Sequence, residues 1–198
     1  MINLKNENII CLIDLELVSI EGSLKNRWHR PIDFPEIIEI GVLKLIYKNG
    51  KFEKLEELLL VVKPIIHKKV PNYILKLTNH NQEYFNNGIT LKEALKKLNN
   101  FCLNANYNFS NGVDGEIIEL NKIKLNFKFL TPEIYNIREF LATHTIMGLI
   151  NTHNALEDCR VMFIKLKSIM AKKKITSFQE TTASPLVKEL VLNYGENN

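Results

Sequence analysis

The chain has 198 residues, of which 45% are hydrophobic and 24% charged, a composition that predicts one folded domain and excludes a disordered protein. Its formal net charge of +4 permits a polyanionic partner without requiring one. Three widely spaced cysteines indicate buried thiols instead of a disulfide or zinc framework, and the first apolar run is too short for a signal peptide or membrane span. We therefore expect a cytoplasmic protein with no membrane partner.

The first third of the chain predicts a three-stranded meander. Residues 9–17 (IICLIDLEL) are apolar on both faces, which is typical of a strand in the centre of a sheet. Residues 35–47 alternate, an Asn49-Gly50 turn follows, and residues 52–64 form the returning strand. The polar loop between the first two strands carries a basic, aromatic set: Lys25, Arg27, Trp28 and Arg30.

Helices with short strands between them are expected after the meander. Thr90 and Glu93 have the spacing of a capping box at the start of an amphipathic helix. The inward face of this helix is expected to carry Leu91, Ala94, Leu95, Leu98 and Phe101. Residues 107–121 predict a short strand, a glycine-containing turn and another helix, residues 127–130 (FKFL) a further strand, and residues 133–142 a helical piece. The pattern indicates a mixed α/β domain, in which ligands collect at strand ends.

The last long helix is preceded by a histidine. The spacing of its apolar residues predicts a stripe that faces the core, formed by Ala155, Cys159, Met162, Leu166 and Ile169. His153 lies five residues before Asp158, which is about 140° of rotation on an ideal helix. The two side chains can therefore meet only if His153 lies in the approach to the helix. An acid in a first turn is also explained by the helix dipole. Residues 1–171 are expected to form the domain, and residues 172–198 a peripheral tail or helix.

Acidic residues gather at the end of the central strand. Asp14 and Glu16 lie on one face of it, because side chains alternate along a strand. A buried carboxylate must be paired, protonated or bound to a metal, and this strand contains no lysine or arginine. The pair therefore favours a hard-cation site, the plainer alternative being a strand end that emerges into solvent. Asp114, beside a glycine, is on its own explained as a turn residue.

Taken together, these motifs resemble those of the DEDDh 3′-to-5′ exonucleases, an RNase H-like family that includes RNase T, oligoribonuclease and the proofreading subunit of bacterial polymerase III. IICLIDLE resembles the first motif, FPEIIEIGVLKL the second strand, FSNGVDGEIIELN the second motif and HNALEDC the third. The resemblance spans residues 9–170 and is closest to the branch of histone-mRNA and RNA-interference-related 3′ exonucleases. Leu17 departs from the small residue or Thr of many members, and the second motif departs from the commoner His-Asn-x-x-Phe-Asp form.

The resemblance implies an RNase H-like mixed central sheet flanked by helices, and a metal-dependent exonuclease that releases 5′-mononucleotides from single-stranded RNA or DNA. It implies two Mg²⁺ or Mn²⁺ ions held by Asp14, Glu16, Asp114 and Asp158, with His153 as general base. Apart from the resemblance, the residue types of the basic, aromatic loop suit it to hold phosphates and stack a base of a single strand, the plainer alternative being a solvated loop. Dimers occur in the family, so a homodimer is compatible with the sequence.

Two other functions fit parts of the pattern. A nucleic-acid-binding module on the same fold with weak or lost catalysis would keep the architecture, although all five candidate residues are present here. A Mg²⁺-dependent phosphatase would explain the two acids on the central strand, but it has no use for the pairing of His153 with Asp158.

Overall fold

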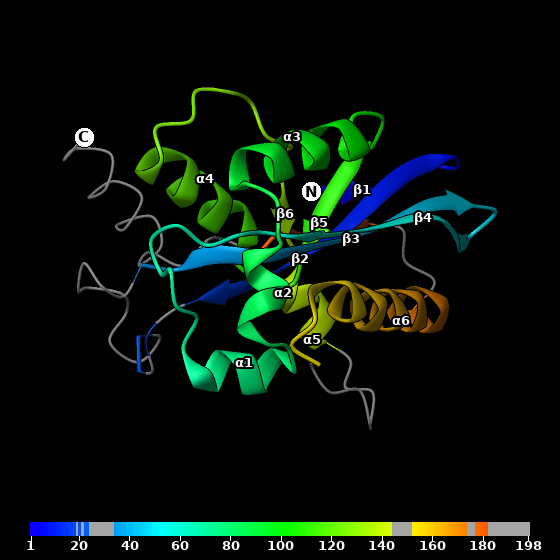
Figure 1. The fold of residues 1–198 in the computed structure, drawn as a ribbon. Coiled ribbons are helices and arrows are strands. Elements are labelled where there is room, and N and C mark those ends of the chain that lie inside the picture. Colours follow the sequence, from blue (N-terminus) through cyan, green and yellow to red (C-terminus); the bar gives the residue numbers. More distant parts are fainter. Residues whose placement is uncertain (19, 21, 24–33, 144–151, 174–176, 182–198) are drawn as a thin grey trace.

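The computed structural model describes residues 1–18, 20, 22–23, 34–143, 152–173 and 177–181. Its centre is a mixed sheet with the strand order β4-β3-β2-β5-β6, in which β3 is antiparallel to β2 and β4, while β5 is parallel to β2 and β6 to β5. The strands are β2 (Asn8–Val18), β3 (Glu36–Lys48), β4 (Lys51–Val61), β5 (Tyr107–Ser110) and β6 (Tyr135–Asn136). The expected mixed α/β sheet is therefore confirmed (Figure 1).

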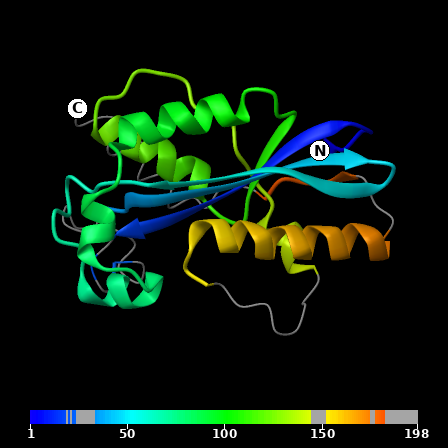
Figure 2. The same cartoon turned by 45° about the vertical axis from the view of Figure 1, so that its right-hand side comes forward.

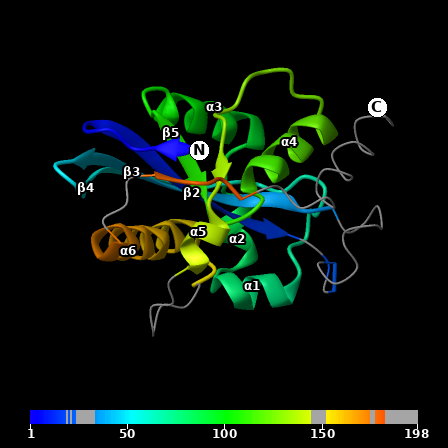
Figure 3. The ribbon, with the colours of Figure 1, turned by 180° about the vertical axis from the view of Figure 1, so that it is seen from behind.

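Helices cover both faces of this sheet. The helices of the described chain are α1 (Asn72–Thr78), α2 (Gln82–Asn86), α3 (Leu91–Cys102), α4 (Asp114–Lys124), α5 (Arg138–Ala142) and α6 (Ala155–Lys173). In Figures 2 and 3, α3 and α4 lie on one face of the sheet. The helices α5 and α6 lie on the other face, and α1 and α2 lie on the same side, toward the other end of the sheet. Each face has its own apolar core, so the sheet is buried on both sides. No helix within the described ranges is long and apolar enough to cross a bilayer.

The meander has the predicted order. β2 lies in the middle of the sheet, and its residues Ile10 to Ile13 are fully buried, as a strand that is apolar on both faces requires. Asn49 and Gly50 both have positive φ, 50° and 75°, which is the backbone of a two-residue hairpin turn. The cysteines Cys11, Cys102 and Cys159 are free and buried, in agreement with the sequence.

Local capping explains where α3 begins. The hydroxyl of Thr90 accepts a hydrogen bond from the backbone N–H of Glu93, and the carboxylate of Glu93 accepts one from the backbone N–H of Thr90 at 3.0 Å. This is the predicted capping box. Of the expected inward residues only Phe101 remains partly exposed, with the ammonium of Lys44 4.2 Å from the centre of its ring.

Two predicted elements are wrong. Residues 127–130 form no strand, because Asn126 with φ 54° ends the turn after α4 and the N–H of Phe127 closes back onto the carbonyl of Lys122. The two aromatic rings of this segment instead pack against the core beneath α3 and α4. Residues 133–142 are not one helical piece, since they include the strand β6 and become helical only at Arg138.

The segment after α6 returns to the domain. Its strand β7 (Ser177–Phe178) pairs antiparallel with β1 (Ile2–Asn3). The ring of Phe178 stacks on that of Phe140 with 4.3 Å between centroids, and the N–H of Thr181 donates to the carbonyl of Asn136. These contacts attach residues 177–181 to the body of the protein, while the domain boundary at residue 171 stays a prediction.

Helix α6 approaches β3 so closely that a glycine is required there. A Cβ atom on Gly41 would overlap the carbonyl group of Ala155 and would lie 2.5 Å from the backbone nitrogen of Leu156. One turn later, the thiol of Cys159 lies 3.3 Å from the carbonyl oxygens of Leu12 and Gly41. The buried stripe of α6 is the one predicted from its spacing. Its first turn therefore rests directly on the backbone of the sheet.

We expect Gly41→Ala to lower the free energy of unfolding by about 3 kcal/mol, because the new methyl group meets backbone atoms that cannot move aside. Chemical denaturation of both proteins measures the difference. Gly112→Ala is the matched control, since its Cβ would meet only side-chain ends, those of Arg138 at 3.3 Å and Asp114 at 3.4 Å, and a change of about 1 kcal/mol or less is expected there. Equal stability of Gly41→Ala and the wild type would contradict the close contact.

Candidate functional site

Three carboxylates converge at the end of the central strand. Asp14 and Glu16 project from one face of β2, and Asp158 projects from the first turn of α6, which covers that face. One oxygen of each lies within 4.8 Å of the others. Glu16 and Asp158 are each only 8% exposed, so the strand end does not simply emerge into solvent. The structure thus brings together three of the four acids expected to hold metal.

Burial and mutual repulsion raise the pKa values of two of these acids, Asp14 and Glu16. The pKa of Asp14 lies well above its ordinary value, because the half-buried carboxyl is largely withdrawn from water and faces the charges of Asp114, Glu16, Asp158 and Glu39. Burial, followed by the charges of Asp158, Glu39 and Asp114, raises the pKa of Glu16 from 4.5 to about 8. A cluster of this kind is stabilised by protons at low pH or by a cation at neutral pH.

Asp114 lies next to this cluster on a different element. It is the first residue of α4, which follows β5, and β5 runs parallel to β2 with Phe109 opposite Leu12. Burial raises the pKa of Asp114 to about 6, while hydrogen bonds from the Ser110 side chain and the Leu15 backbone oppose the shift. Asp114 is not one of the three acids whose oxygens meet within 4.8 Å. Its charge nevertheless contributes more to the raised pKa of Asp14 than any other charge does.

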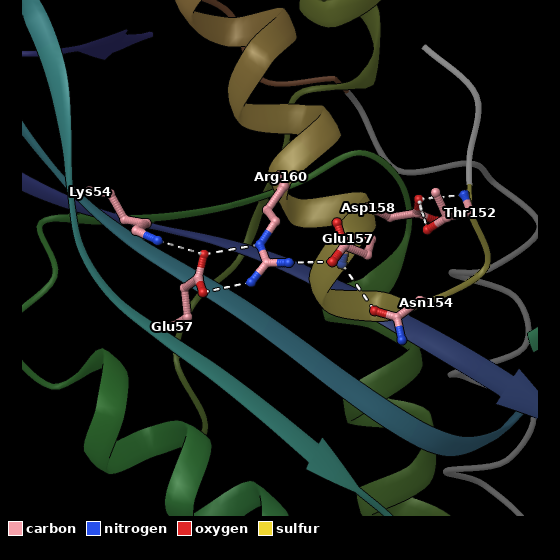
Figure 4. A network of polar contacts seen from close by, with 7 residues as sticks. All are labelled: Lys54, Glu57, Thr152, Asn154, Glu157, Asp158 and Arg160. Atoms are coloured by element: carbon pink, nitrogen blue, oxygen red, sulfur yellow. Dashed lines mark hydrogen bonds and ion pairs between the residues drawn. The ribbon is translucent and has the colours of Figure 1, made fainter. Parts of the chain in front are cut away.

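His153 lies outside α6, as its spacing from Asp158 requires. The helix begins at Ala155, and His153 has a left-handed backbone with φ 54°. Its two neighbours are tied to the helix: the backbone N–H and the hydroxyl of Thr152 donate to Asp158 Oδ1 at 2.7 and 3.0 Å, and Asn154 Oδ1 accepts from the backbone N–H of Glu157 (Figure 4). His153 therefore sits in a turn that folds back onto its own helix.

The donor set fits a hard divalent cation. All three converging ligands are carboxylate oxygens, the type that Mg²⁺ and Mn²⁺ prefer, and neither a thiol nor an imidazole is among them. The raised pKa values of Asp14 and Glu16 describe the cost of leaving their charges uncompensated. A bound cation would remove that cost.

Lys25, Arg27, Trp28 and Arg30, the expected nucleic-acid contacts, lie outside the described residues. One acid of the site was not among the predicted residues: Glu39 on β3, which contributes to the raised pKa of both Asp14 and Glu16. Its sequence signal was an acid inside the apolar run EIIEIGVL, which is the same kind of signal that singled out Asp14 and Glu16.

Solved structures with the same architecture are 3′-exonucleases. A full-length 3′-exonuclease matches with a TM-score of 0.70 and 18% sequence identity, over 91% of this chain and 92% of its own. The nuclease domain of 3'hExo, a DEDDh family member bound to rAMP, matches with a TM-score of 0.69 and 18% identity, over 90% of this chain and 98% of that domain. The chain has the fold of a DEDDh exonuclease domain.

A third solved structure with this DEDDh fold is a 3′-exonuclease that recognises the 3′ end of a histone mRNA stem-loop, with a TM-score of 0.68 and 17% identity over 92% of this chain and 93% of its own. No protein-family model and no curated protein matches the sequence. At these identities the likeness establishes the fold, which confirms the expected RNase H-like architecture. The roles of single residues depend on the geometry described above.

Without divalent ions, we expect the protein to lose stability as the pH rises from about 5 to 8. The pKa of Glu16 moves from 4.5 to about 8, so between these values the folded protein keeps a proton that the unfolded chain has released. Raising the pH therefore favours unfolding. Melting temperatures measured in EDTA across this range test the trend.

Two controls belong to this experiment. Mn²⁺ should raise the melting temperature most at the alkaline end, where the ionised carboxylates bind it. Glu16→Gln should flatten the pH dependence in EDTA, because it removes one of the two carboxyl groups with a raised pKa and one of the charges that raise the pKa of Asp14. A melting temperature that climbs steadily with pH in EDTA would contradict the raised pKa.

Proposed function

We propose that the protein is a metal-dependent 3′-to-5′ exonuclease that hydrolyses single-stranded RNA or DNA and releases 5′-mononucleotides. The observation that carries the proposal is the convergence of Asp14, Glu16 and Asp158 within 4.8 Å at the end of β2, on the fold of a DEDDh nuclease domain. Phosphodiester hydrolysis is catalysed by divalent cations that relieve negative charge on the phosphate, and clustered carboxylates are the groups that hold such cations.

Four acids would hold two Mg²⁺ or Mn²⁺ ions in this proposal. Asp14, Glu16 and Asp158 would bind one ion, and Asp114 together with Asp14 would bind the second, a sharing that is consistent with the strong effect of Asp114 on the pKa of Asp14. When bound, such ions relieve charge on the phosphoryl oxygens, acidify the attacking water and stabilise the departing 3′ oxygen.

His153 would act as the general base. In its neutral form an imidazole nitrogen accepts the proton of the attacking water, and a turn outside the helix leaves the ring free to face the acids from the side of α6. The hydrogen bonds from Thr152 to Asp158 hold this turn next to the acid cluster.

The substrate class is supported by the similar structures, which are 3′-exonucleases, one of them bound to rAMP and one recognising a histone mRNA stem-loop. RNA is therefore the first substrate to test, with DNA beside it. A homodimer, a cytoplasmic location and a role of residues 25–30 in binding remain predictions.

End-labelled strands test the proposal directly. With Mg²⁺ or Mn²⁺, we expect a 5′-blocked single strand to shorten stepwise and to release 5′-mononucleotides, whereas a 3′-blocked strand resists. Asp14→Ala should abolish the ladder, because it removes the acid shared by both ions, while circular dichroism still reports a folded protein. Cleavage of a circular strand, or full activity in EDTA, would contradict the proposal; binding without cleavage would favour the binding module.

A second prediction concerns the general base. We expect His153→Ala to lower turnover by about 10² to 10⁴, the usual effect of removing a general base, and to leave Mn²⁺ affinity close to that of the wild type. Asp158→Asn is the comparison, because it should weaken Mn²⁺ binding as well as turnover. Calorimetry and rates at saturating Mn²⁺ separate the two. Parallel loss of Mn²⁺ affinity in His153→Ala would make His153 a ligand, and an unchanged rate would make it a loop residue without a role.

A further inference from the structure

Glu39 is a fifth acid at the site, beside Asp14, Glu16, Asp114 and Asp158, and both of its oxygens accept hydrogen bonds from the protein. The residue lies on β3 and is fully buried. One oxygen, Oε1, accepts a hydrogen bond from the hydroxyl of Tyr84 at 2.8 Å, and the other, Oε2, accepts a long one of 3.4 Å from the backbone N–H of Ala155. Because both oxygens already have protein donors, Glu39 is suited to hold chain segments in place and not to bind a cation.

The position of Glu39 relates it to the metal-binding acids. In the antiparallel ladder of β2 and β3 it is the direct partner of Glu16, so the two side chains leave the same face of the sheet side by side. Its charge contributes to the raised pKa of Asp14 and of Glu16. Keeping a further buried carboxylate here is costly, which calls for an interaction that offsets the cost.

That interaction is with the first residue of α6. Glu39 binds the N–H of Ala155, and Gly41, two residues further along the same face of β3, lies directly beneath the carbonyl group of Ala155. Ala155 is thus held on β3 on both sides of its Cα. A carboxylate at this end of a helix also interacts favourably with the helix dipole. Asp158 follows three residues later, and His153 precedes by two.

The other oxygen of Glu39 connects this point to the α1–α2 region. Tyr84 belongs to α2, and its ring is stacked on that of His80 with 3.7 Å between centroids. The Nε2 atom of His80, which is buried and has no hydrogen bond among the described residues, lies 3.3 Å from Oε1 of Glu39. Glu39 therefore joins β3, α2 and the start of α6 at one carboxylate.

We propose that Glu39 is a positioning residue of the acidic site: by binding Ala155 and Tyr84 at once, it holds the first turn of α6 so that Asp158 faces Asp14 and Glu16. The inference rests on the proposed function for its consequence on turnover, but its consequence for metal binding stands apart from any activity. The length of the side chain, which lets it span two donors, is the property that matters, and its charge is secondary.

Two substitutions separate length from charge. Glu39→Asp keeps the charge but shortens the side chain by one carbon–carbon bond, about 1.5 Å, so that it cannot reach both donors. Glu39→Gln keeps the length: its carbonyl oxygen accepts from Ala155, and its NH₂ group donates to the oxygen of Tyr84. We expect Glu39→Asp to weaken Mn²⁺ binding by about tenfold or more and to lower kcat similarly with little change in KM, and Glu39→Gln to stay close to wild type.

Glu36→Asp is the matched control. Glu36 lies on the same strand, is also buried, and accepts hydrogen bonds from the backbone N–H groups of Ile65, Ile66 and His67, which belong to a loop away from α6. Shortening it should reduce thermal stability and leave Mn²⁺ affinity unchanged. Amide hydrogen exchange in the metal-free protein adds a direct readout, since the N–H of Ala155 should exchange faster in Glu39→Asp than in Glu36→Asp or Glu39→Gln.

The reverse order, with Glu39→Gln impaired and Glu39→Asp normal, would overturn the proposal in favour of a purely electrostatic role. Equal Mn²⁺ affinity of Glu39→Asp and Glu36→Asp would overturn it in favour of general stability. Calorimetry with Mn²⁺ alone and amide exchange need no substrate. A wild type that binds Mn²⁺ but cleaves no strand would therefore refute the proposed exonuclease, whereas both measurements would still test the role of Glu39.

Discussion

Repulsion within the cluster of Asp14, Glu16 and Asp158 is the constraint on which the arrangement around it depends. Two unit charges about 4 Å apart repel by about 4 kcal/mol at the effective dielectric of a protein near its surface, and the oxygens here meet within 4.8 Å. Such groups separate unless rigid elements hold them. Two of the acids are therefore placed on β2, which is paired on both sides, while the third comes from a helix that must be held against the sheet.

Buried contacts, more than surface charges, hold that helix. Figure 4 shows Arg160 of α6 in a bidentate ion pair with Glu57 of β4, with distances of 3.0 and 2.7 Å, and the guanidinium lowers the pKa of Glu57 to about 2. The two side chains are partly exposed, 40% for Arg160 and 22% for Glu57, and ion pairs that solvent reaches contribute little to stability. The close approach at Gly41, where a methyl group has no room, constrains the position of α6 far more tightly than this ion pair does. It fixes the height of α6 above β3, and Glu39 fixes the start of the helix at the same place.

Much of this could be predicted from local patterns. The central strand, the hairpin at Asn49, the capping box and the stripe of α6 depend on neighbours in the sequence, and all are present. The strand expected at residues 127–130 failed because aromatic residues with alternating spacing also suit a loop packed on a core, and β6 is too short to leave a pattern. Glu39 was missed for another reason. Its importance lies in contacts with Tyr84 and Ala155, 45 and 116 residues away, which no local pattern contains.

Asp158 also fixes the turn that contains His153, because it accepts the hydrogen bonds of Thr152. An imidazole on α6 itself would be fixed to one side of the helix, whereas φ 54° at His153 turns the chain so that Thr152 comes back to Asp158 Oδ1. The acid that would bind the cation therefore also closes the turn that would hold the base, and Asn154 secures its other end through Glu157. A left-handed backbone at a non-glycine residue is costly, and it persists where neighbouring contacts enforce it. Here those contacts belong to the acidic site, so the position of His153 depends on the same carboxylate that is proposed to bind the metal.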